Sequence, residues 1–419
     1  MEYKNVITSQ LLLNWITRIL FFTTLSALLP AMPNYISDLG GNKAQTGIVI
    51  AAMALGVLLF RPIVGKKIDV VGRKIVLIFG ILIFIIAPII YIFIKSVIAL
   101  LLARVFHGLG LAAFGTASIT LITDSAPYDK RTQVISYTGM MNTIGFAVGP
   151  VLGFTIWNTW GYNVLFGFIS VLSALCLLTA AFIKETKIPS HSQNEVNYWH
   201  AIKHRKILVA AAIILLVAMV HSGIIIFLPL FLSDVDFNFG IFFTVYGISA
   251  FIVRLAVGPA SERFGRGPSL VFALFLIAIG VLTLSQTKGM YFIFFAAVLY
   301  GFGFGAHQPT LTTLVADNTT EETRGKIFSF YYGGFDLGFV IAGPLLGVIA
   351  ENFELKSVFF VSACLASVAL IIFATLMEST LLRSLRCALT LKKTTKQCMI
   401  CDQYQEVAPQ QAEEYFKNS

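Results

Sequence analysis

The segment Arg61-Pro-Ile-Val-Gly65-Lys-Lys-Ile-Asp69-Val-Val-Gly72-Arg73-Lys74 occurs twice in this chain, the second time as Arg254-Leu-Ala-Val-Gly258-Pro-Ala-Ser-Glu262-Arg-Phe-Gly265-Arg266-Gly267. The two copies are 193 residues apart, and the same spacing relates Gly108 to Gly301 and Asp124 to Asp317. Further along, the spacing becomes 194, between Gly149-Pro150 and Gly343-Pro344. A spacing kept over so much sequence indicates two homologous halves of about 190 residues, the arrangement by which transporters build two bundles around one central site.

The composition places most of the chain in lipid. Hydrophobic residues make up 57% of the 419 residues and charged residues only 12%, and the mean hydropathy is +0.83. A soluble globular chain is much less apolar. We therefore predict an all-α integral membrane protein, with the lipid bilayer as its surroundings.

Apolar runs long enough for a helix to cross a bilayer, about 20 residues, divide into six per half. The predicted spans are 11–36, 45–63, 75–94, 97–122, 133–157 and 164–183, then 207–232, 239–256, 269–286, 290–315, 326–350 and 357–377. The predicted domains are an N-terminal six-helix bundle (1–183), a polar cytoplasmic linker (184–206), a C-terminal six-helix bundle (207–377) and a cytoplasmic tail (378–419).

The basic residues predict the orientation. Almost all of them, Arg61 and Arg254 included, fall on one side of the predicted spans, and only Lys43, Lys95, Lys288 and Lys356 fall on the other. Basic loops stay in the cytoplasm, so we expect both termini there, and we expect the membrane to be a bacterial inner membrane. The net charge of +9 then results from the basic cytoplasmic loops, and no nucleic-acid partner is expected.

The repeated segment resembles the loop between spans 2 and 3 of the major facilitator superfamily. The residues that carry the resemblance are Gly65, Asp69, Gly72 and Arg73, with Glu262 and Arg266 in the weaker second copy. Gly72 suits a tight turn, and Asp69 with Arg73 supplies charges for pairs across the bundle interface. The resemblance implies that Asp69 helps to hold the outward-facing state. The alternative is a solvated, positively charged loop.

Span 4 carries Arg104-Val-Phe-His107-Gly108-Leu-Gly110, which resembles a motif of the superfamily that is associated with proton coupling. An Arg inside a span is costly unless it faces an interior or a counter-charge; the alternative for Arg104 is snorkelling to the interface. His107 either titrates near neutral pH or is a satisfied interior histidine.

Span 5 carries Gly145, Gly149, Pro150 and Gly153 in a pattern similar to the antiporter motif of exporters in the superfamily. Small residues allow close helix packing and proline bends the helix, so generic tight packing is the alternative. Span 1, with Pro30 and Pro33, is also similar to the twelve-span drug/proton antiporters. The resemblance covers residues 8–377, and Phe154 departs from the span 5 pattern.

Asp336 is the most unusual single residue, because it lies near the middle of span 11 while the other acidic residues lie near span ends or in loops. Burial favours the neutral carboxyl, so a carboxyl reached by water from alternating sides can load and release protons. We predict Asp336 as the proton carrier, with Arg104 and His107 as further coupling residues. A permanent pair with Arg18 or Arg104 and direct binding of a cationic substrate stay open.

Other polar residues at span depth are candidates for a substrate cavity or for helix–helix hydrogen bonds: Asn14, Arg18, Asn142, His221, Tyr246, Tyr300, His307 and Gln308. The three histidines of spans 4, 7 and 10 stand at different depths, so no metal site is expected. Cys398 and Cys401 in the tail form a lone CxxC without a second ligand pair, so neither metal nor redox use is expected there.

No phosphate-binding loop or hydrolase motif is present in the sequence. We expect no enzyme and no cofactor, with the proton gradient as the energy source. The predicted function is proton-coupled export of a small amphipathic drug or metabolite by alternating access, by a chain that works as a monomer. The alternatives are a dedicated exporter of a siderophore, a metallophore or another anionic metabolite, for which Arg18 and Arg104 would be counter-charges, then a sugar or organic-anion importer, and a membrane sensor.

Overall fold

The computed structural model describes residues 8–125, 131–186, 204–233, 239–286, 289–319 and 321–377. All regular structure within these ranges is α-helical. The first half contains α1 (Ser9–Ala27), α2 (Met32–Asp38), α3 (Lys43–Val71), α4 (Arg73–Phe93), α5 (Val97–Ser125) and α6 (Arg131–Ala181). The second half contains α8 (Arg205–Ser233), α9 (Phe239–Phe264), α10 (Arg266–Ser285), α11 (Met290–Asp317), α12 (Glu321–Asn352) and α13 (Leu355–Leu376).

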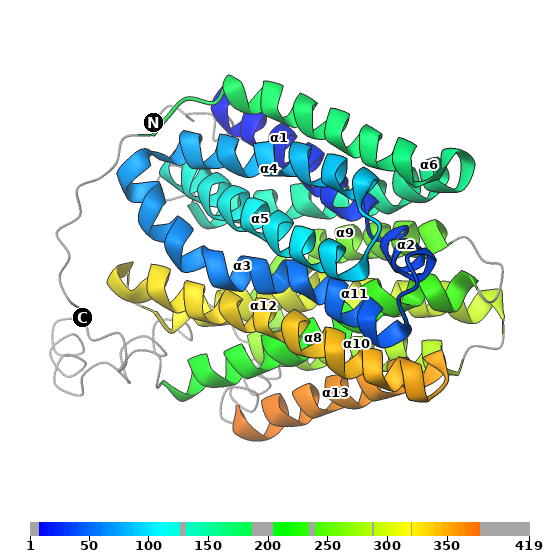
Figure 1. Cartoon of the computed structure of the whole chain (residues 1–419). Coiled ribbons are helices and arrows are strands. Elements are labelled where there is room, and N and C mark those ends of the chain that lie inside the picture. Colours follow the sequence, from blue (N-terminus) through cyan, green and yellow to red (C-terminus); the bar gives the residue numbers. More distant parts are fainter. Residues whose placement is uncertain are drawn as a thin grey trace, which may run out of the picture.

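The long helices lie side by side and run roughly in one direction (Figure 1). α1 packs on α6, α3 on α5 and α4 on α5 in the first half, and α8 on α12, α9 on α11 and α10 on α11 in the second. Two helix pairs make most of the contact between the halves, α3 with α12 and α6 with α9. In Figure 1, α3 lies along α12 between the two groups of helices.

Glycines end helices at matching positions of the two halves. α3 gives way to α4 at Gly72, whose φ is 107°, and α9 gives way to α10 at Gly265, whose φ is 86°. Both angles lie in the left-handed region that glycine adopts without strain. Asn42 begins α3 with a reciprocal cap, since its side chain accepts from the amide of Gln45 and the Gln45 side chain accepts from the amide of Asn42.

Two breaks lie in or beside predicted spans. Ser9–Asp38 is one apolar stretch, as predicted, but its helix is interrupted at Leu28–Ala31, around Pro30, because proline removes a helix donor. The predicted gap between spans 5 and 6 contains Gly161, where α6 is broken with φ 82°. One glycine in the left-handed region lets the chain bend there without a separate loop.

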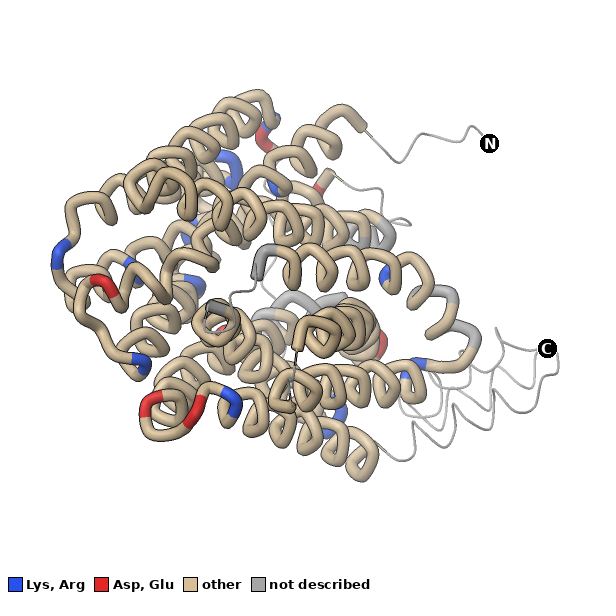
Figure 2. The backbone as a smooth tube through the Cα atoms, turned by 90° about the vertical axis from the view of Figure 1, so that its right-hand side faces the viewer, with Lys and Arg blue, Asp and Glu red and all other residues tan. Residues whose placement is uncertain are grey.

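Within the described residues, ten helical stretches are long and apolar enough to cross a membrane. One of them, Tyr137–Ala181, has 45 residues and contains the break at Gly161, and Ile241–Val257 is a shorter apolar helix. The protein is thus a multi-pass membrane protein, and twelve crossings stay a prediction. Charged residues are sparse along the described tube (Figure 2).

Candidate functional site

Asp336 and Arg61 form an ion pair between the two halves. The carboxylate Oδ2 of Asp336, on α12, lies 2.8 Å from Nη2 of Arg61, on α3. The Asp336 side chain is only 12% exposed and that of Arg61 is 34% exposed. The suggested pairing of Asp336 with Arg18 or Arg104 is therefore wrong. The sequence places Arg61 with the basic residues on the cytoplasmic side of the spans, but α3 continues to Val71, so Arg61 lies about 15 Å before the end of the helix.

Arg254 stands at the matching position of the second repeat and also reaches the opposite half. From α9, its Nη1 donates to the carbonyl oxygen of Gly139, at 2.7 Å, and to the hydroxyl of Thr143, both on α6. Its Nη2 donates to Oε1 of Gln308 at 3.1 Å. The first residue of each repeated segment thus joins one half to the other, through a carboxylate in one case and neutral acceptors in the other.

Arg18 on α1 is buried and binds neutral acceptors. Its Nε donates to Oδ1 of Asn142 at 3.0 Å and its Nη1 donates to the hydroxyl of Ser118 at 2.9 Å. Its guanidinium carbon lies 5.4 Å from the ring centre of Phe22 and 6.0 Å from that of Phe114. Asn142 and Thr143 are neighbours on α6, so Arg18 and Arg254 hold the same helical turn from different halves.

Tyr332 lies near Arg18, Arg61 and Arg254. Its hydroxyl lies within electrostatic range of Arg61, Arg18 and Arg254. Tyr332 precedes Asp336 by one helical turn on α12, so both project from the same side of that helix. We call Arg18, Arg61, Arg254 and Tyr332 the arginine cluster. Our sequence interpretation missed Arg61, Arg254 and Tyr332 as site residues, although the repeat of Arg61 at Arg254 was a signal that could have found two of them.

Arg104 and His107 lie elsewhere in the first half. Both are buried, with 4% and 0% of the residue exposed, so snorkelling of Arg104 to the interface is not what the structure shows. Nδ1 of His107 shares a 2.8 Å hydrogen bond with the hydroxyl of Tyr91, and the ring of Phe84 packs against the imidazole. Within the described structure, no hydrogen bond or ion pair connects Arg104 or His107 to Asp336.

Most of the remaining cavity candidates form an aromatic cluster inside the second half. Nδ1 of His221 lies 2.6 Å from the hydroxyl of Tyr300, and Tyr246 stacks on Tyr300. Phe304, which the sequence did not single out, stacks on His221 with ring centres 4.2 Å apart. His307 is buried and lies within electrostatic range of Arg254.

The candidates therefore divide between this aromatic cluster, the arginine cluster and the first half, and they do not gather around a single point. Asn14 on α1 is 1% exposed, and its Oδ1 has no hydrogen-bond partner within the described part of the chain.

The charged residues of the repeated loops make pairs within each half. Arg73 Nε lies 2.5 Å from Oδ2 of Asp124 on α5, and Arg266 pairs with Asp317 on α11 in the same way. The expectation that Arg73 forms a pair across the bundle interface is therefore wrong in this structure, because α5 belongs to the same half. The side chains of Asp69 and Glu262 lie outside the described residues.

The span 5 glycines allow α6 to touch α1. A Cβ placed at Gly145 would lie 2.7 Å from Cβ of Phe22, and one at Gly149 would lie 2.6 Å from the carbonyl oxygen of Thr23. Gly153 meets the backbone of Ala27 in the same way, and Pro150 lies inside the helix between them. No larger residue fits at these contacts, so close packing accounts for the glycines in this structure.

The two halves are in close contact at one end of the interface. Gly47 on α3 packs against the backbone of Gly343 on α12, and the amide of Lys43 donates to Oε2 of Glu351 at 2.9 Å. Toward the other end, nothing lies within 4 Å of a Cβ placed at Gly65 or at Gly333. Backbone contact between α3 and α12 is thus present at the Lys43 end, whereas a side chain at Gly65 or Gly333 would stand in open space.

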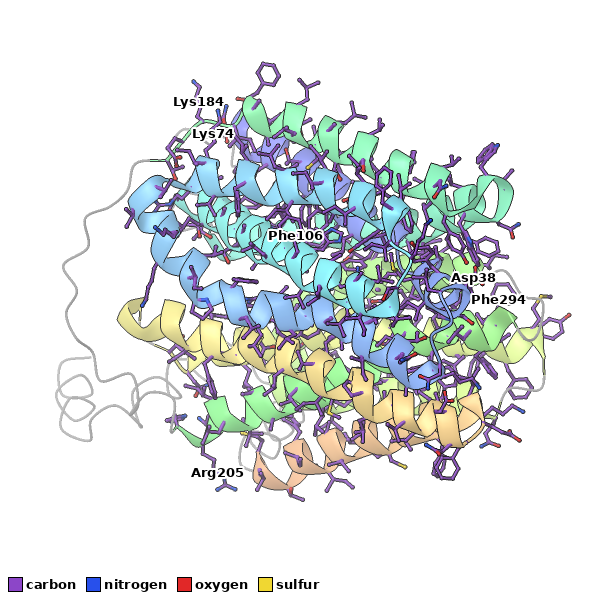
Figure 3. The ribbon with its side chains drawn as sticks, in the orientation of Figure 1. Asp38, Lys74, Phe106, Lys184, Arg205 and Phe294 are labelled. Atoms are coloured by element: carbon purple, nitrogen blue, oxygen red, sulfur yellow. The ribbon has the colours of Figure 1, made fainter. Side chains whose placement is uncertain are left out.

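The basic end of the molecule is the end away from this backbone contact. Lys74, Lys184 and Arg205 lie at one end of the molecule in Figure 3, and Asp38 lies at the other. Asp38 accepts a hydrogen bond from the hydroxyl of Tyr162 at 2.7 Å.

Comparison with known proteins gives consistent relatives. The family model described as Major Facilitator Superfamily matches residues 15–253 and 235–386. The chain is similar to the staphylopine export protein of Staphylococcus aureus, with 26% identity over 374 residues, covering 85% of this chain and 93% of that protein. It is also similar to the multidrug resistance protein MdtG of Enterobacter lignolyticus, with 26% identity over 371 residues, covering 84% and 88%.

Solved structures share the fold. The nucleoside transporter NupG superposes with a TM-score of 0.70 at 14% identity, covering 88% of this chain and 100% of that chain. A bacterial homologue of the human lysosomal transporter Spinster, in an inward-facing and unoccupied conformation, superposes with a TM-score of 0.68 at 15% identity, covering 94% and 100%.

Proposed function

The chain belongs to the major facilitator superfamily and is a membrane transporter of small molecules, and we propose that it exports its substrate in exchange for protons by alternating access. The direction is supported by the two relatives, one named as an export protein and one as a multidrug resistance protein. The substrate is a small amphipathic drug or metabolite, and the proton gradient supplies the energy.

The orientation follows from the basic residues. Because basic loops stay in the cytoplasm, the end with Lys74, Lys184 and Arg205 is cytoplasmic, and both termini lie there. The tight contact between Gly47 and Gly343 then closes the outer side of the interface. We propose that the carrier stands in its inward-facing state in a bacterial inner membrane and works as a monomer.

The ion pair between Asp336 and Arg61 is the observation that carries the proposed coupling. It joins helices of different halves and is mostly shielded from solvent. A proton on Asp336 removes one of the two charges, so the pair loses its electrostatic attraction and the two halves lose one contact. A contact present in one protonation state and absent in the other is what couples a proton to a change of conformation.

The test is Asp336→Asn in proteoliposomes that carry a pH-sensitive dye. The amide keeps the shape of the side chain but cannot take up a proton, so substrate-driven proton movement should disappear while the protein stays folded. Asp38→Asn is the matched control, because Asp38 lies at the other end and bonds Tyr162 instead of an arginine. Proton movement at the wild-type rate in Asp336→Asn would show that Asp336 is structural and that the proton carrier lies elsewhere.

A further inference from the structure

We infer that Arg18 and Arg254 form a binding subsite for an anionic group of the substrate, such as a carboxylate or phosphate, at the α6 turn that contains Asn142 and Thr143. The transported molecule is then an amphipathic organic anion. This inference rests on the proposed function, because it names the class of substrate that the exporter carries.

The first step of the argument is the shared helical turn. Arg18 donates to Asn142 at 3.0 Å, and Arg254 donates to Thr143 and, at 2.7 Å, to Gly139. The two guanidinium groups come from different halves, since α1 belongs to the first and α9 to the second. An anion bound by both guanidinium groups would contact both halves at once, so a bound substrate would draw the halves together.

The second step is the charge balance. Within the described ranges, the only carboxylate at ion-pair distance from the arginine cluster is that of Asp336, and it lies on Arg61. Among the residues that the structure describes, Arg18 and Arg254 bind neutral oxygens alone. Nε of Arg254 is buried and has no hydrogen-bond partner among the described residues. A buried cation without a counter-charge is expensive, so these two arginines favour a ligand that brings negative charge.

The third step is the internal repeat. With the spacing of 194 that relates Gly149 to Gly343, Asp336 corresponds to Asn142, and Gly333 corresponds to Gly139. The second half therefore supplies a carboxylate to its facing arginine, and the first half supplies an amide of almost the same shape. A carboxylate of the substrate would therefore give the arginines at α6 the negatively charged partner that Asp336 gives Arg61 at α12.

The surroundings suit an amphipathic anion. The ring of Phe22 lies beside Arg18 and is only partly buried, so it offers an apolar surface to the rest of the molecule, whereas the nearby ring of Phe114 is fully buried. The other titratable groups that face Arg254 are Tyr246, His307 and Tyr332. A ligand that enters this region thus meets cations and aromatic rings, with Asp336 already occupied by Arg61.

The test uses two dyes with the same ring system and opposite charge, fluorescein as the anion and tetramethylrhodamine methyl ester as the cation. Their binding to the purified full-length chain is measured by fluorescence anisotropy in non-ionic detergent. We expect saturable binding of fluorescein to the wild type and much weaker binding of the rhodamine ester. Arg254→Gln should weaken fluorescein binding by at least about tenfold, since hydrogen bonds to charged groups are the stronger class.

The decisive variant is Asn142→Asp, with Asn142→Ala as its matched neutral control. The new carboxylate would pair with Arg18 and take the place of the substrate anion, so fluorescein binding should fall by at least about tenfold. Asn142→Ala removes the acceptor of Arg18 without adding a charge, so its loss of fluorescein binding should be clearly smaller than that of Asn142→Asp. Thermal unfolding and gel filtration check that each variant is folded.

Three outcomes would overturn the inference: no saturable fluorescein binding to the wild type, preferential binding of the rhodamine ester, or equal losses in Asn142→Asp and Asn142→Ala. If Asn142→Asp does not fold, the test rests on Arg254→Gln. This variant should lose binding of fluorescein more than binding of the rhodamine ester, and an equal change for the two dyes would overturn the inference. Because binding in detergent needs no transport, the subsite can stand even if Asp336→Asn still moves protons, and that second result would count against the proposed coupling alone.

Discussion

Substituting Gly47 by alanine should open the tight end of the interface between α3 and α12. The added Cβ would lie 2.8 Å from the carbonyl carbon of Gly343 and 3.2 Å from Cα of Gly347. Favourable carbon–carbon contacts lie at about 3.5–4.0 Å, so the two helices must separate by roughly 1 Å. The atoms in the way belong to backbone, which cannot move aside as the end of a side chain can.

The cost of such overpacking is about 1–3 kcal/mol, and it falls only on the conformation in which this end is closed. The equilibrium between the two conformations should therefore shift toward the one with this end open by roughly 5- to 150-fold. Gly65→Ala is the matched control on the same helix, because nothing lies within 4 Å of a Cβ at that position.

Double electron–electron resonance can measure the shift. Ile98 at the start of α5 and Tyr291 at the start of α11 are exposed, stand 193 residues apart, and report on the closed end. Val71 and Phe264 have the same spacing and report on the other end. The labels need a background without the five native cysteines.

We expect longer distances between Ile98 and Tyr291 and shorter distances between Val71 and Phe264 in Gly47→Ala. Distances unchanged from those of Gly65→Ala would refute the idea that backbone contact at Gly47 holds this end closed.

Two further predictions concern the basic end of the molecule. Glu185 accepts hydrogen bonds from the first two amides of α4, at 3.1 and 2.9 Å, so Glu185→Ala should lower stability by about 1 kcal/mol, seen as a lower midpoint of thermal unfolding. Glu354→Ala, at a helix start without a side-chain cap, should change it less. Asp69→Asn should shift the carrier toward the inward-facing state by about 1 kcal/mol, as the resemblance implies, and Lys66→Gln should not. Distances between Val71 and Phe264 measure both variants, and equal distances in the two would leave Asp69 without the role of a latch.

Much of the architecture could be predicted from the repeat and the composition. The apolar runs predict the membrane helices, and the matching glycines Gly72 and Gly265 predict where α3 and α9 end. The predicted gap between residues 157 and 164 contains the break at Gly161, but the sequence did not predict that a single glycine with positive φ would make this break without a separate loop. The break at Pro30 was visible in the sequence, but the hydropathy of the surrounding residues concealed its effect.

The candidate site could be predicted only in part. Asp336 was identifiable because an acid in the middle of an apolar run is rare. Its partner was not, because the choice between Arg18, Arg61 and Arg104 depends on which helices face each other across the two halves, and the hydropathy of each helix alone contains no such information. Arg61 also stands close enough to the basic loop to be counted with it.

Each half has an arginine at the same position of the repeat, but the two arginines bind different partners. Arg61 and Arg254 occupy the same position of the repeat and both cross the interface, so the duplication accounts for two similar contacts between the halves. Only the contact at α12 contains a carboxylate, because Asn142 stands where symmetry would place a second Asp336. A proton can therefore weaken the α3–α12 contact but finds no acid among the described side chains of the α6–α9 contact. We infer that this one difference, an acid at Asp336 and an amide at Asn142, separates two roles. The proton acts at α12 and the substrate anion acts at α6.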